Sequence, residues 1–295
     1  MEFVMVEIRK AVRKKAKLRL GIAAPSGAGK TYSSLLLAFG LGQKVGLIDT
    51  EHGSGDLYAD LGDYDIIQIE APYTIDKYLQ AIKAFEQANY DVIIIDSLSH
   101  AWAGDGGLLD KQGKIAESGK NNSYSAWRFV TPEHNSLVNA MLASPCHIIA
   151  TMRSKQDYVL QDNGNGKQAP KKVGMAPIQR DGMEYEFTVM FDIDINHNAT
   201  ATKDRTRLFD GEIFKITSQT GEQLLEWLNV GITREQAELS VFKEKAKDAQ
   251  DINELKIAFE NAYRKLDGFP EQDEAKKFYD ELKEKFTTEE GDAAV

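Results

Sequence analysis

A run of small residues that ends in a lysine and a threonine has the spacing of a phosphate-binding loop. The run is Ala24, Pro25, Ser26, Gly27, Ala28, Gly29, Lys30 and Thr31. Small residues let backbone amides point at phosphate oxygens, and a helix that follows the loop aims its positive end at the same point. Lys30 would reach the terminal phosphates and the Thr31 hydroxyl would ligate magnesium. The run therefore predicts an ATP and magnesium site that extends to Tyr32. Ala24 departs from the pattern, which begins with glycine, and a glycine-rich turn without a ligand is the alternative.

An acidic strand end supplies a second part of the predicted site. The apolar run Val92, Ile93, Ile94 and Ile95 is followed directly by Asp96. Unbroken apolar runs of this length are typical of strands covered on both faces by helices. A carboxylate at the end of such a strand lies at the carboxyl edge of a parallel sheet, beside the phosphate loop. We therefore expect Asp96 to hold magnesium together with Thr31; an aspartate that only forms a turn is the alternative.

These side chains require a parallel sheet to bring them together. Short apolar runs predict strands at 18–24, 45–49, 66–69, 92–95 and 147–152. Strands that alternate with helices predict an α/β fold with a mostly parallel sheet and crossover helices. One helix is expected from Thr31 to a stop at Gly40, and another to open at Thr131 with Pro132 at its first position. Residues 104–125 and 155–183 have no usable period, which predicts long loops.

Composition limits the remaining choices. The chain has 295 residues, 42% of them hydrophobic and 28% charged, which is typical of a soluble globular protein. No apolar run is long enough to predict a membrane span, and the single cysteine, Cys146, fits a reducing cytosol. The predicted parts are a basic arm (1–17), an ATPase domain (18–230), a small C-terminal helical module (231–287) and a disordered tail (288–295). A capping box at Thr233 opens the helical module.

Two strand ends resemble those of RecA-type ATPases. Leu47, Ile48, Asp49, Thr50, Glu51 and His52 resemble the second core strand of that family, and Val92 to Ser97 resembles its magnesium strand. The order of the motifs also matches, over about residues 20–220. The resemblance implies a RecA-like P-loop NTPase core, an AAA family ATPase in the broad sense, with Glu51 as the general base. A surface glutamate after a strand is the alternative. Thr151 falls where the family places a γ-phosphate sensor, normally a glutamine.

The same resemblance implies partners. RecA-like proteins put DNA-contacting loops at the places of 104–125 and 155–183. These segments and their edges carry basic and aromatic residues suited to a single strand: Lys111, Lys114, Lys120, Tyr124, Trp127, Arg128, Lys155, Lys167, Lys171, Lys172 and Arg180. A solvated loop without function is the alternative, and Trp102 and Trp127 are equally consistent with core positions. Lys203 and Arg205 lie close to where RecA relatives present a basic pair to the γ-phosphate of a neighbouring subunit, which implies a homo-oligomer.

The finer resemblance is to phage-encoded single-strand annealing proteins and recombinases of the Sak type, and residues 180–187 and 202–206 carry it. The predicted function is ATP hydrolysis coupled to single-stranded DNA in recombination or annealing, in a ring or filament, in the bacterial cytosol. The net charge of −10 argues against constitutive DNA coating but leaves a local basic surface open. The alternatives are an ATP-dependent switch that binds a protein and ignores DNA, and a helicase loader or motor subunit. The C-terminal helices offer a surface for a protein partner.

Overall fold

The computed structural model describes residues 10–118, 122–162 and 168–292, with side chains described except at 156–174 and 287–292. The chain divides into two compact units. The larger unit is Lys17–Leu228, and the described residues on either side of it form the smaller one. Within the described residues, no helix is both long and apolar enough to cross a membrane.

A nine-stranded sheet forms the centre of the larger unit, in the order β3-β2-β4-β5-β1-β7-β8-β9, with β6 paired to β5 outside this path. The strands are β1 Arg19–Ala24, β2 Val45–Asp49, β3 Asp65–Gln68, β4 Val92–Asp96, β5 His147–Asp162, β6 Gln168–Pro177, β7 Val189–Ile193, β8 Ala199–Asp204 and β9 Ile213–Phe214. The pairs from β3 to β7 are parallel, while β6, β8 and β9 add antiparallel pairs. The predicted α/β class with a mostly parallel sheet is confirmed. The carboxyl ends of β1, β2 and β4 meet at one edge, and Met152 and Arg153 in the middle of β5 lie at the same edge, in register with the end of β1.

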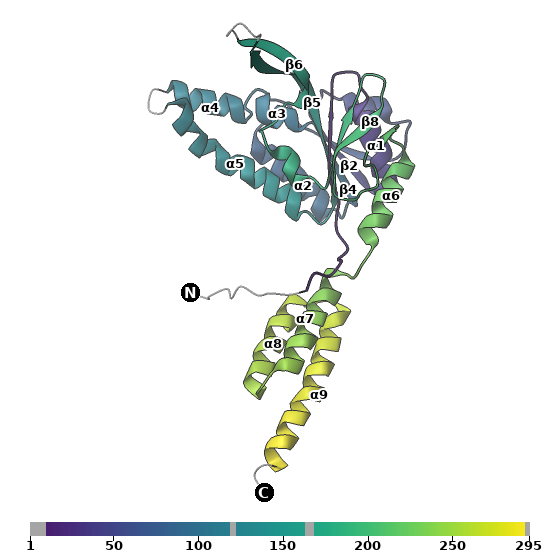
Figure 1. The fold of residues 1–295 in the computed structure, drawn as a ribbon, viewed down its shortest axis with the longest axis vertical. Coiled ribbons are helices and arrows are strands. Elements are labelled where there is room, and N and C mark those ends of the chain that lie inside the picture. The colour runs from purple at the N-terminus through teal and green to yellow at the C-terminus, as the bar shows by residue number, and fades with distance from the viewer. Residues whose placement is uncertain (1–9, 119–121, 163–167, 293–295) are drawn as a thin grey trace. The chain divides into compact units, whose positions relative to one another are not determined.

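Helices cover both faces of the sheet (Figure 1). On one face lie α1 Lys30–Leu41 and α6 Ser218–Asn229; on the other lie α2 Ile75–Gln87, α3 Leu98–Ala103, α4 Leu108–Glu117 and α5 Ser123–Ala143. A hydrophobic core lies on each face of the sheet, and strand β4 contributes side chains to both. Ile93 and Ile95 pack in one core, and Val92 and Ile94 pack in the other. Burial on both faces explains its unbroken apolar run.

Helix α1 does not end at Gly40, contrary to the prediction. It continues to Leu41, and Gly42 is its C-cap. The glycine has a packing reason instead: a β-carbon on Gly40 would lie 2.0 Å from the carbonyl oxygen of Ser218, and one on Gly221 would lie 2.3 Å from that of Leu37. The two glycines therefore allow the backbones of α1 and α6 to cross at close range.

Helix α5 begins before the predicted start at Thr131. Its N-cap is Asn122, whose side chain accepts a hydrogen bond from the Ser125 amide at 2.7 Å. Pro132 lies inside the helix, where it removes one backbone donor. Buried residues continue on one face past the proline, at Ala126, Val130, His134, Leu137 and Met141. That continuous buried face holds the helix together across Pro132.

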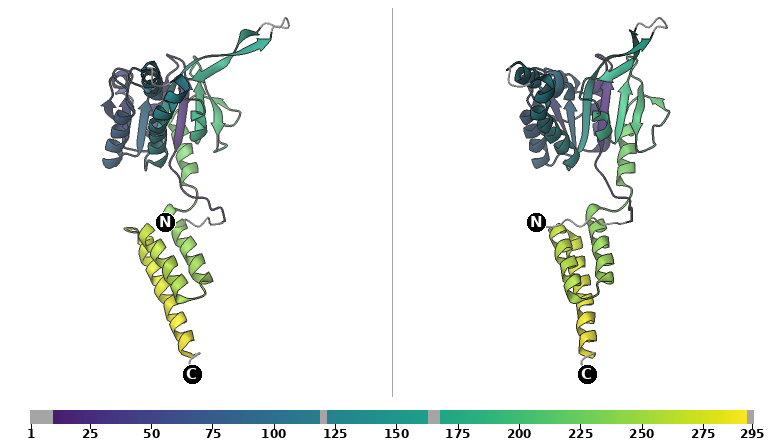
Figure 2. Two further views of the ribbon diagram at one scale, coloured as in Figure 1. Left: turned by 90° about the vertical axis from the view of Figure 1, so that its left-hand side faces the viewer. Right: turned by 60° about the vertical axis from the view of Figure 1, so that its left-hand side comes forward.

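The two stretches predicted as loops contain regular structure. Helix α4 and the start of α5 lie within 104–125. Strand β5 runs on to Asp162 and pairs antiparallel with β6, with a register irregularity between Asp157 and Tyr158. This β5–β6 ribbon extends away from the sheet in each of the drawn views (Figures 1 and 2). The sequence of this ribbon lacks the regular alternation of apolar and polar residues that marks a half-buried strand, so its backbone pairing could not be predicted from the sequence.

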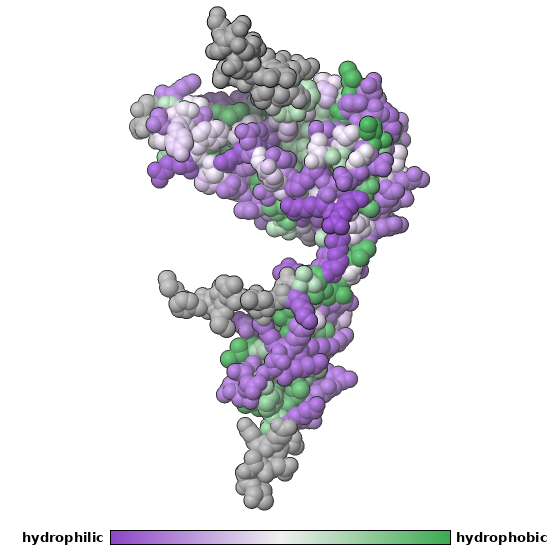
Figure 3. All heavy atoms as spheres, in the orientation of Figure 1, coloured by the Kyte–Doolittle hydropathy of each residue, from purple (hydrophilic) through white to green (hydrophobic). Residues whose placement is uncertain are grey.

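The smaller unit is a three-helix assembly of α7 Arg234–Asp248, α8 Ile252–Lys265 and α9 Pro270–Asp292. Both hydrogen bonds of the capping box between Thr233 and Gln236 are present. A separate core of Leu239, Phe242, Leu255 and Leu266, with other side chains around it, joins the helices, and mostly hydrophilic residues cover the face drawn in Figure 3. Helix α9 continues past residue 287, where the predicted module ends. Of the predicted arm, residues 1–9 lie outside the described residues, as do 293–295 of the predicted tail.

Candidate nucleotide site

The phosphate loop joins the end of β1 to the start of α1. Gly27 and Gly29 have φ angles of 79° and 87°, a left-handed backbone that glycine adopts without the cost of a β-carbon. Gly29 is the N-cap of α1 and offers no side chain to the first amides. The first amides of a helix have no partner within the helix. The loop and the helix start therefore direct free donors to one point, which fits a phosphate.

Lys30 is turned back toward the loop. Its Nζ donates to the carbonyl oxygens of Ala24 at 3.5 Å and Pro25 at 3.3 Å. Burial lowers the pKa of Lys30, while the carboxylates of Asp96 and Glu51 oppose this change. Carbonyl contacts at the long end of the hydrogen-bond range are weak, so an anion in the loop would compete for the ammonium group.

Asp96 is buried at the carboxyl end of β4, where two hydroxyls contact it. Thr31 Oγ1 donates to one carboxylate oxygen, and Thr151 Oγ1 donates to the other at 2.5 Å. Burial raises the pKa of Asp96, and the two hydroxyls partly offset this rise because they stabilise the ionised form. Hydroxyl and carboxylate oxygens are the ligands that magnesium prefers. The pair of Thr31 and Asp96 therefore fits magnesium, which when bound beside ATP would neutralise phosphate charge.

Thr151 lies at the expected strand, but its hydroxyl is directed at Asp96. The side chain is fully buried, with 0% exposed. Strand β5 lies between β1 and β4, so Thr151 faces the carboxylate from the neighbouring strand. This contact makes Thr151 a support for Asp96, and no described contact directs it to the phosphate loop.

Glu51 follows β2 and forms an ion pair with Arg153, 102 residues away in sequence. Arg153 Nε donates to Glu51 Oε1 at 2.9 Å, a second guanidinium nitrogen contacts Oε2, and Ser97 Oγ donates to Oε1 at 3.2 Å. Burial alone would raise the pKa of Glu51, but the hydrogen bonds and charge of Arg153 outweigh burial and lower it. Asp49 fixes the turn, because its carboxylate accepts from the Glu51 amide at 2.6 Å. Glu51 is thus held at the same edge as Asp96.

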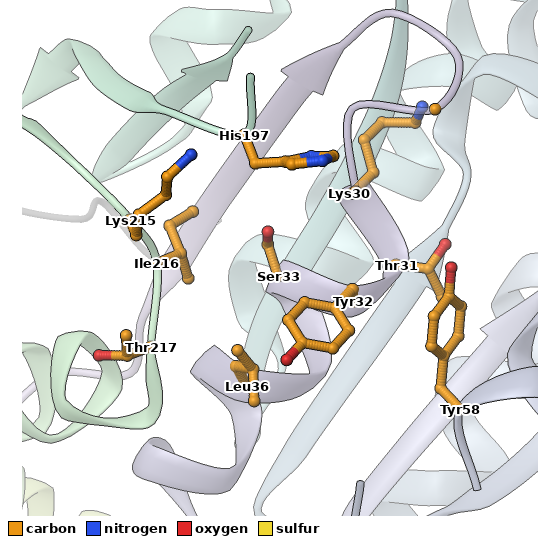
Figure 4. Close-up of a pocket in the computed structure, with 12 residues that line it drawn as sticks. Lys30, Thr31, Tyr32, Ser33, Leu36, Tyr58, His197, Lys215, Ile216 and Thr217 are labelled. Carbon is orange, nitrogen blue, oxygen red and sulfur yellow. The ribbon is translucent and has the colours of Figure 1, made fainter. Parts of the chain in front are cut away.

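A cavity of about 670 Å³ opens beside the phosphate loop (Figure 4). Of the predicted nucleotide-binding residues, Gly27 and Gly29 to Tyr32 line it. The sequence interpretation missed the other residues that line it. Ser33 and Leu36 follow on α1, and distant segments contribute Tyr58, His197, Lys215, Ile216 and Thr217. Tyr32 and Tyr58 lie edge to face, with ring centroids 6.1 Å apart. The cavity suits a flat base next to a phosphate group.

Part of this lining had a sequence signal. Tyr58 ends η1 Ser54–Tyr58, the short helical turn that follows Glu51, so an aromatic residue soon after β2 was a usable clue. His197 approaches from the turn between β7 and β8, and its Nδ1 lies 3.0 Å from the carbonyl oxygen of Ala28. Nothing local in the sequence marks His197 or Lys215 as neighbours of the loop.

A second cavity of about 790 Å³ lies at the base of the β5–β6 ribbon. The side chains of Trp102 and Trp127 stack there with centroids 5.5 Å apart, half-buried against the core. Cationic and aromatic residues complete the lining: Tyr124, Arg128, Lys155 and Arg180, with Thr131, Pro132, Gln179 and Asp181. Tyr124 is 89% exposed. The structure thus gathers several residues of the predicted single-strand surface in one place.

Other predicted basic residues are placed differently. Lys111 pairs with Glu133, and Lys114 with Asp110 at 2.6 Å. Lys120 and Lys167 lie outside the described residues, as do the side chains of Lys171 and Lys172.

Lys203 and Arg205 both contact η2 Met183–Glu186. Lys203 Nζ donates to the carbonyl oxygens of Glu184 at 3.0 Å and Tyr185 at 2.6 Å, and Arg205 donates to Tyr185 at 3.3 Å. The two cations therefore approach the same short turn. Asp204 instead accepts hydrogen bonds from the amides of Thr206 and Phe209.

In this chain a phosphate loop joins a strand of a mostly parallel sheet to a helix, and the Thr31 hydroxyl and the buried Asp96 carboxylate lie beside it. This arrangement defines the class of P-loop ATPases. The family described as "AAA domain" matches residues 16–227, and the chain belongs to it. A solved structure described as the RadB recombinase is similar at 16% identity with a TM-score of 0.36, over 68% of this chain and 88% of that one. No curated protein sequence matches this chain.

Proposed function

We propose that this chain binds ATP with magnesium at the phosphate loop and hydrolyses it. The observation that carries the proposal is the convergence of Thr31, Asp96 and Glu51 at the carboxyl edge of one sheet. The loop amides and Lys30 would bind the phosphates, and Thr31 with Asp96 would hold magnesium. The base would pack against Tyr32 and Tyr58 in the adjoining cavity.

In this proposal Glu51 orients the attacking water. Most of the barrier in phosphoryl transfer is lowered by positioning and charge, so a carboxylate that accepts a hydrogen bond from water is sufficient. Thr151 would keep Asp96 ionised for the metal. Lys203 and Arg205 would face the γ-phosphate of a neighbouring subunit in a ring or filament, where they would stabilise negative charge.

The test of nucleotide binding is Lys30→Ala. We expect the variant to lose ATP turnover and to bind ATP weakly, measured by titration with a fluorescent ATP analogue. Lys44→Ala is the matched control, because Lys44 lies outside the cavity and contacts Ala88 instead. Normal turnover in Lys30→Ala would move the nucleotide site away from the loop.

We further propose that the chain acts on single-stranded DNA in recombination or annealing, as a relative of the phage Sak-type proteins. The second cavity supports this proposal, since stacked tryptophans beside Arg128, Lys155 and Arg180 offer both a platform for bases and charge for the backbone. Base stacking on an aromatic side chain is worth about 1–3 kcal/mol and tolerates any sequence.

Binding to oligo(dT) at several salt concentrations tests the DNA proposal. Contact with about four phosphates predicts a slope of roughly −3 in a log–log plot of affinity against salt, and loss of one cation reduces the slope by about 0.7. Arg128→Ala and Lys155→Ala should each show that reduction, and the double variant Lys171→Ala/Lys172→Ala should show about twice that reduction, while Lys111→Ala should show none. Affinity independent of salt and of these substitutions would exclude this surface, and hydrolysis without DNA binding would favour a protein-binding switch.

A further inference from the structure

The carboxylate of Glu51 accepts hydrogen bonds from two neighbouring side chains, which occupy three of its about four acceptor sites. Arg153 contacts both of its oxygens, and Ser97 donates to one of them. A guanidinium that spans both oxygens takes the best-directed lone pairs of a carboxylate. To orient a water molecule, Glu51 must accept a hydrogen bond from that water. The observed ion pair and the proposed catalytic contact therefore compete for the same oxygens.

The ion pair lies partly open to solvent, so it can be exchanged. The side chain of Arg153 is 44% exposed and that of Glu51 20%. The charge of Arg153 also lowers the pKa of Lys30, after the larger effect of burial, so the guanidinium lies within electrostatic range of the phosphate loop. A terminal phosphate in the loop would attract the same guanidinium that holds Glu51.

The backbone of Arg153 is tied to the base of the β5–β6 ribbon. Its amide donates to Ser99 Oγ at 2.9 Å, and its carbonyl accepts from the Ile178 amide at 2.6 Å. Ile178 directly follows β6, and Gln179 donates to the carbonyl oxygen of Leu98 at 3.1 Å. Gln179 and Lys155 line the second cavity. A shift of the ribbon base on ligand binding would therefore move Arg153 relative to Glu51.

We infer that Arg153 is a positioning residue that restrains Glu51, and that a single strand seated in the second cavity relieves the restraint through the ribbon base. The inference rests on the proposed function, because it takes Glu51 as the residue that orients water. It adds a regulatory role to Arg153 and a physical route between the two cavities.

The test uses Arg153→Gln in the full-length chain, because glutamine removes the charge and the two-pronged contact while keeping a polar side chain. Without DNA, we expect ATP turnover to rise about three- to fivefold, the size of effect that a partly exposed ion pair has on an equilibrium. The stimulation by oligo(dT) should fall to nearly none. Arg153→Lys should lie between the variant and the wild type. Arg234→Gln, an exposed arginine of α7, is the matched control and should change neither rate.

The pH dependence of turnover separates restraint from a merely structural role. Since Arg153 lowers the pKa of Glu51, its removal should move the acidic limb of the pH–rate profile to higher pH. Among the described residues, the other titratable groups that interact electrostatically with Glu51 are His100, Asp96, Lys30, Tyr73 and Tyr78, and they are the same in both proteins. A residue that only supports the fold would lower the rate and leave the limb in place.

A folded Arg153→Gln that keeps the wild-type basal rate, stimulation and acidic limb would overturn the inference. If this variant fails to fold, Arg153→Lys is judged by the same three readouts. If the wild type hydrolyses ATP but ignores oligo(dT), the DNA part of the proposed function fails, and the route between the cavities fails with it. The basal rate and the acidic limb then still decide whether Arg153 restrains Glu51.

Discussion

Replacing Thr151 with valine should weaken magnesium binding, because the hydroxyl of Thr151 supports Asp96. Valine keeps the shape of threonine and removes one of the two hydroxyls that contact the buried carboxylate. A hydrogen bond to a charged group contributes about 1.5–3 kcal/mol. Loss of a residue that supports a metal ligand typically costs about 10–100-fold in metal affinity. We therefore expect the magnesium concentration for half-maximal ATP turnover to rise by about that factor.

The nucleotide-free protein should show the same loss as reduced stability. For a unit of this size, about 1.5–3 kcal/mol corresponds to a fall in Tm of roughly 3–12 °C. Burial already raises the pKa of Asp96, and loss of the hydroxyl raises it further. The defect concerns the ionised carboxylate, so it should be largest at high pH and shrink as the pH falls through the raised pKa of Asp96. Melting curves across this range test the sign.

Thr151→Ser is the control, since serine keeps the hydroxyl and should retain most of the magnesium affinity. The reasoning is refuted if Thr151→Val has the wild-type magnesium dependence and Tm but no longer distinguishes ATP from ADP. That result would return Thr151 to the role of γ-phosphate sensor.

Three further predictions test the fold and the site. Gly40→Ala should destabilise the larger unit by roughly 1–3 kcal/mol, since the added carbon would lie 2.0 Å from the Ser218 carbonyl oxygen; an unchanged Tm would contradict the close crossing of α1 and α6. Tyr58→Ala should weaken ATP binding by about fivefold or more and leave tripolyphosphate binding unaltered, because stacking contributes about 1–3 kcal/mol per base; Tyr58→Phe should bind normally, and equal losses for both ligands would remove the base from this cavity. Lys30→Ala subunits mixed with Lys203→Ala/Arg205→Ala subunits should regain part of the ATPase activity if the cations act across an interface; co-assembled but inactive mixtures, seen by native mass spectrometry, would make the pair structural.

The predictable parts of this protein are those whose chemistry is encoded in a few adjacent residues. The loop from Gly27 to Thr31 needs small residues, a lysine and a hydroxyl in order, and the strand before Asp96 needs apolar residues on both faces. Such local demands leave a pattern that can be read without the fold. The parallel sheet followed from the alternation of strands and helices, and the structure confirms it.

The errors arose where packing overrides local preference. Glycine often ends a helix, but Gly40 lies within α1 and allows α6 to cross it closely. Proline often begins a helix, but Pro132 lies within α5, which tertiary contacts stabilise. Contacts between segments that are distant in the sequence could not be predicted from it. Nothing near Glu51 indicates that Arg153 binds it, and nothing near the phosphate loop indicates that His197 approaches it, because both contacts depend on the order of strands in the sheet.

The fate of bound ATP in Glu51→Gln tests the central claim most directly. Wild-type protein and the variant are loaded with radiolabelled ATP and magnesium, and the bound nucleotide is separated and identified over time. We predict that the wild type converts ATP to ADP, whereas Glu51→Gln binds ATP comparably and retains it uncleaved, because the amide no longer accepts a proton from water. Equal rates of conversion in the two proteins would contradict the assignment of Glu51 and the catalytic site built around it.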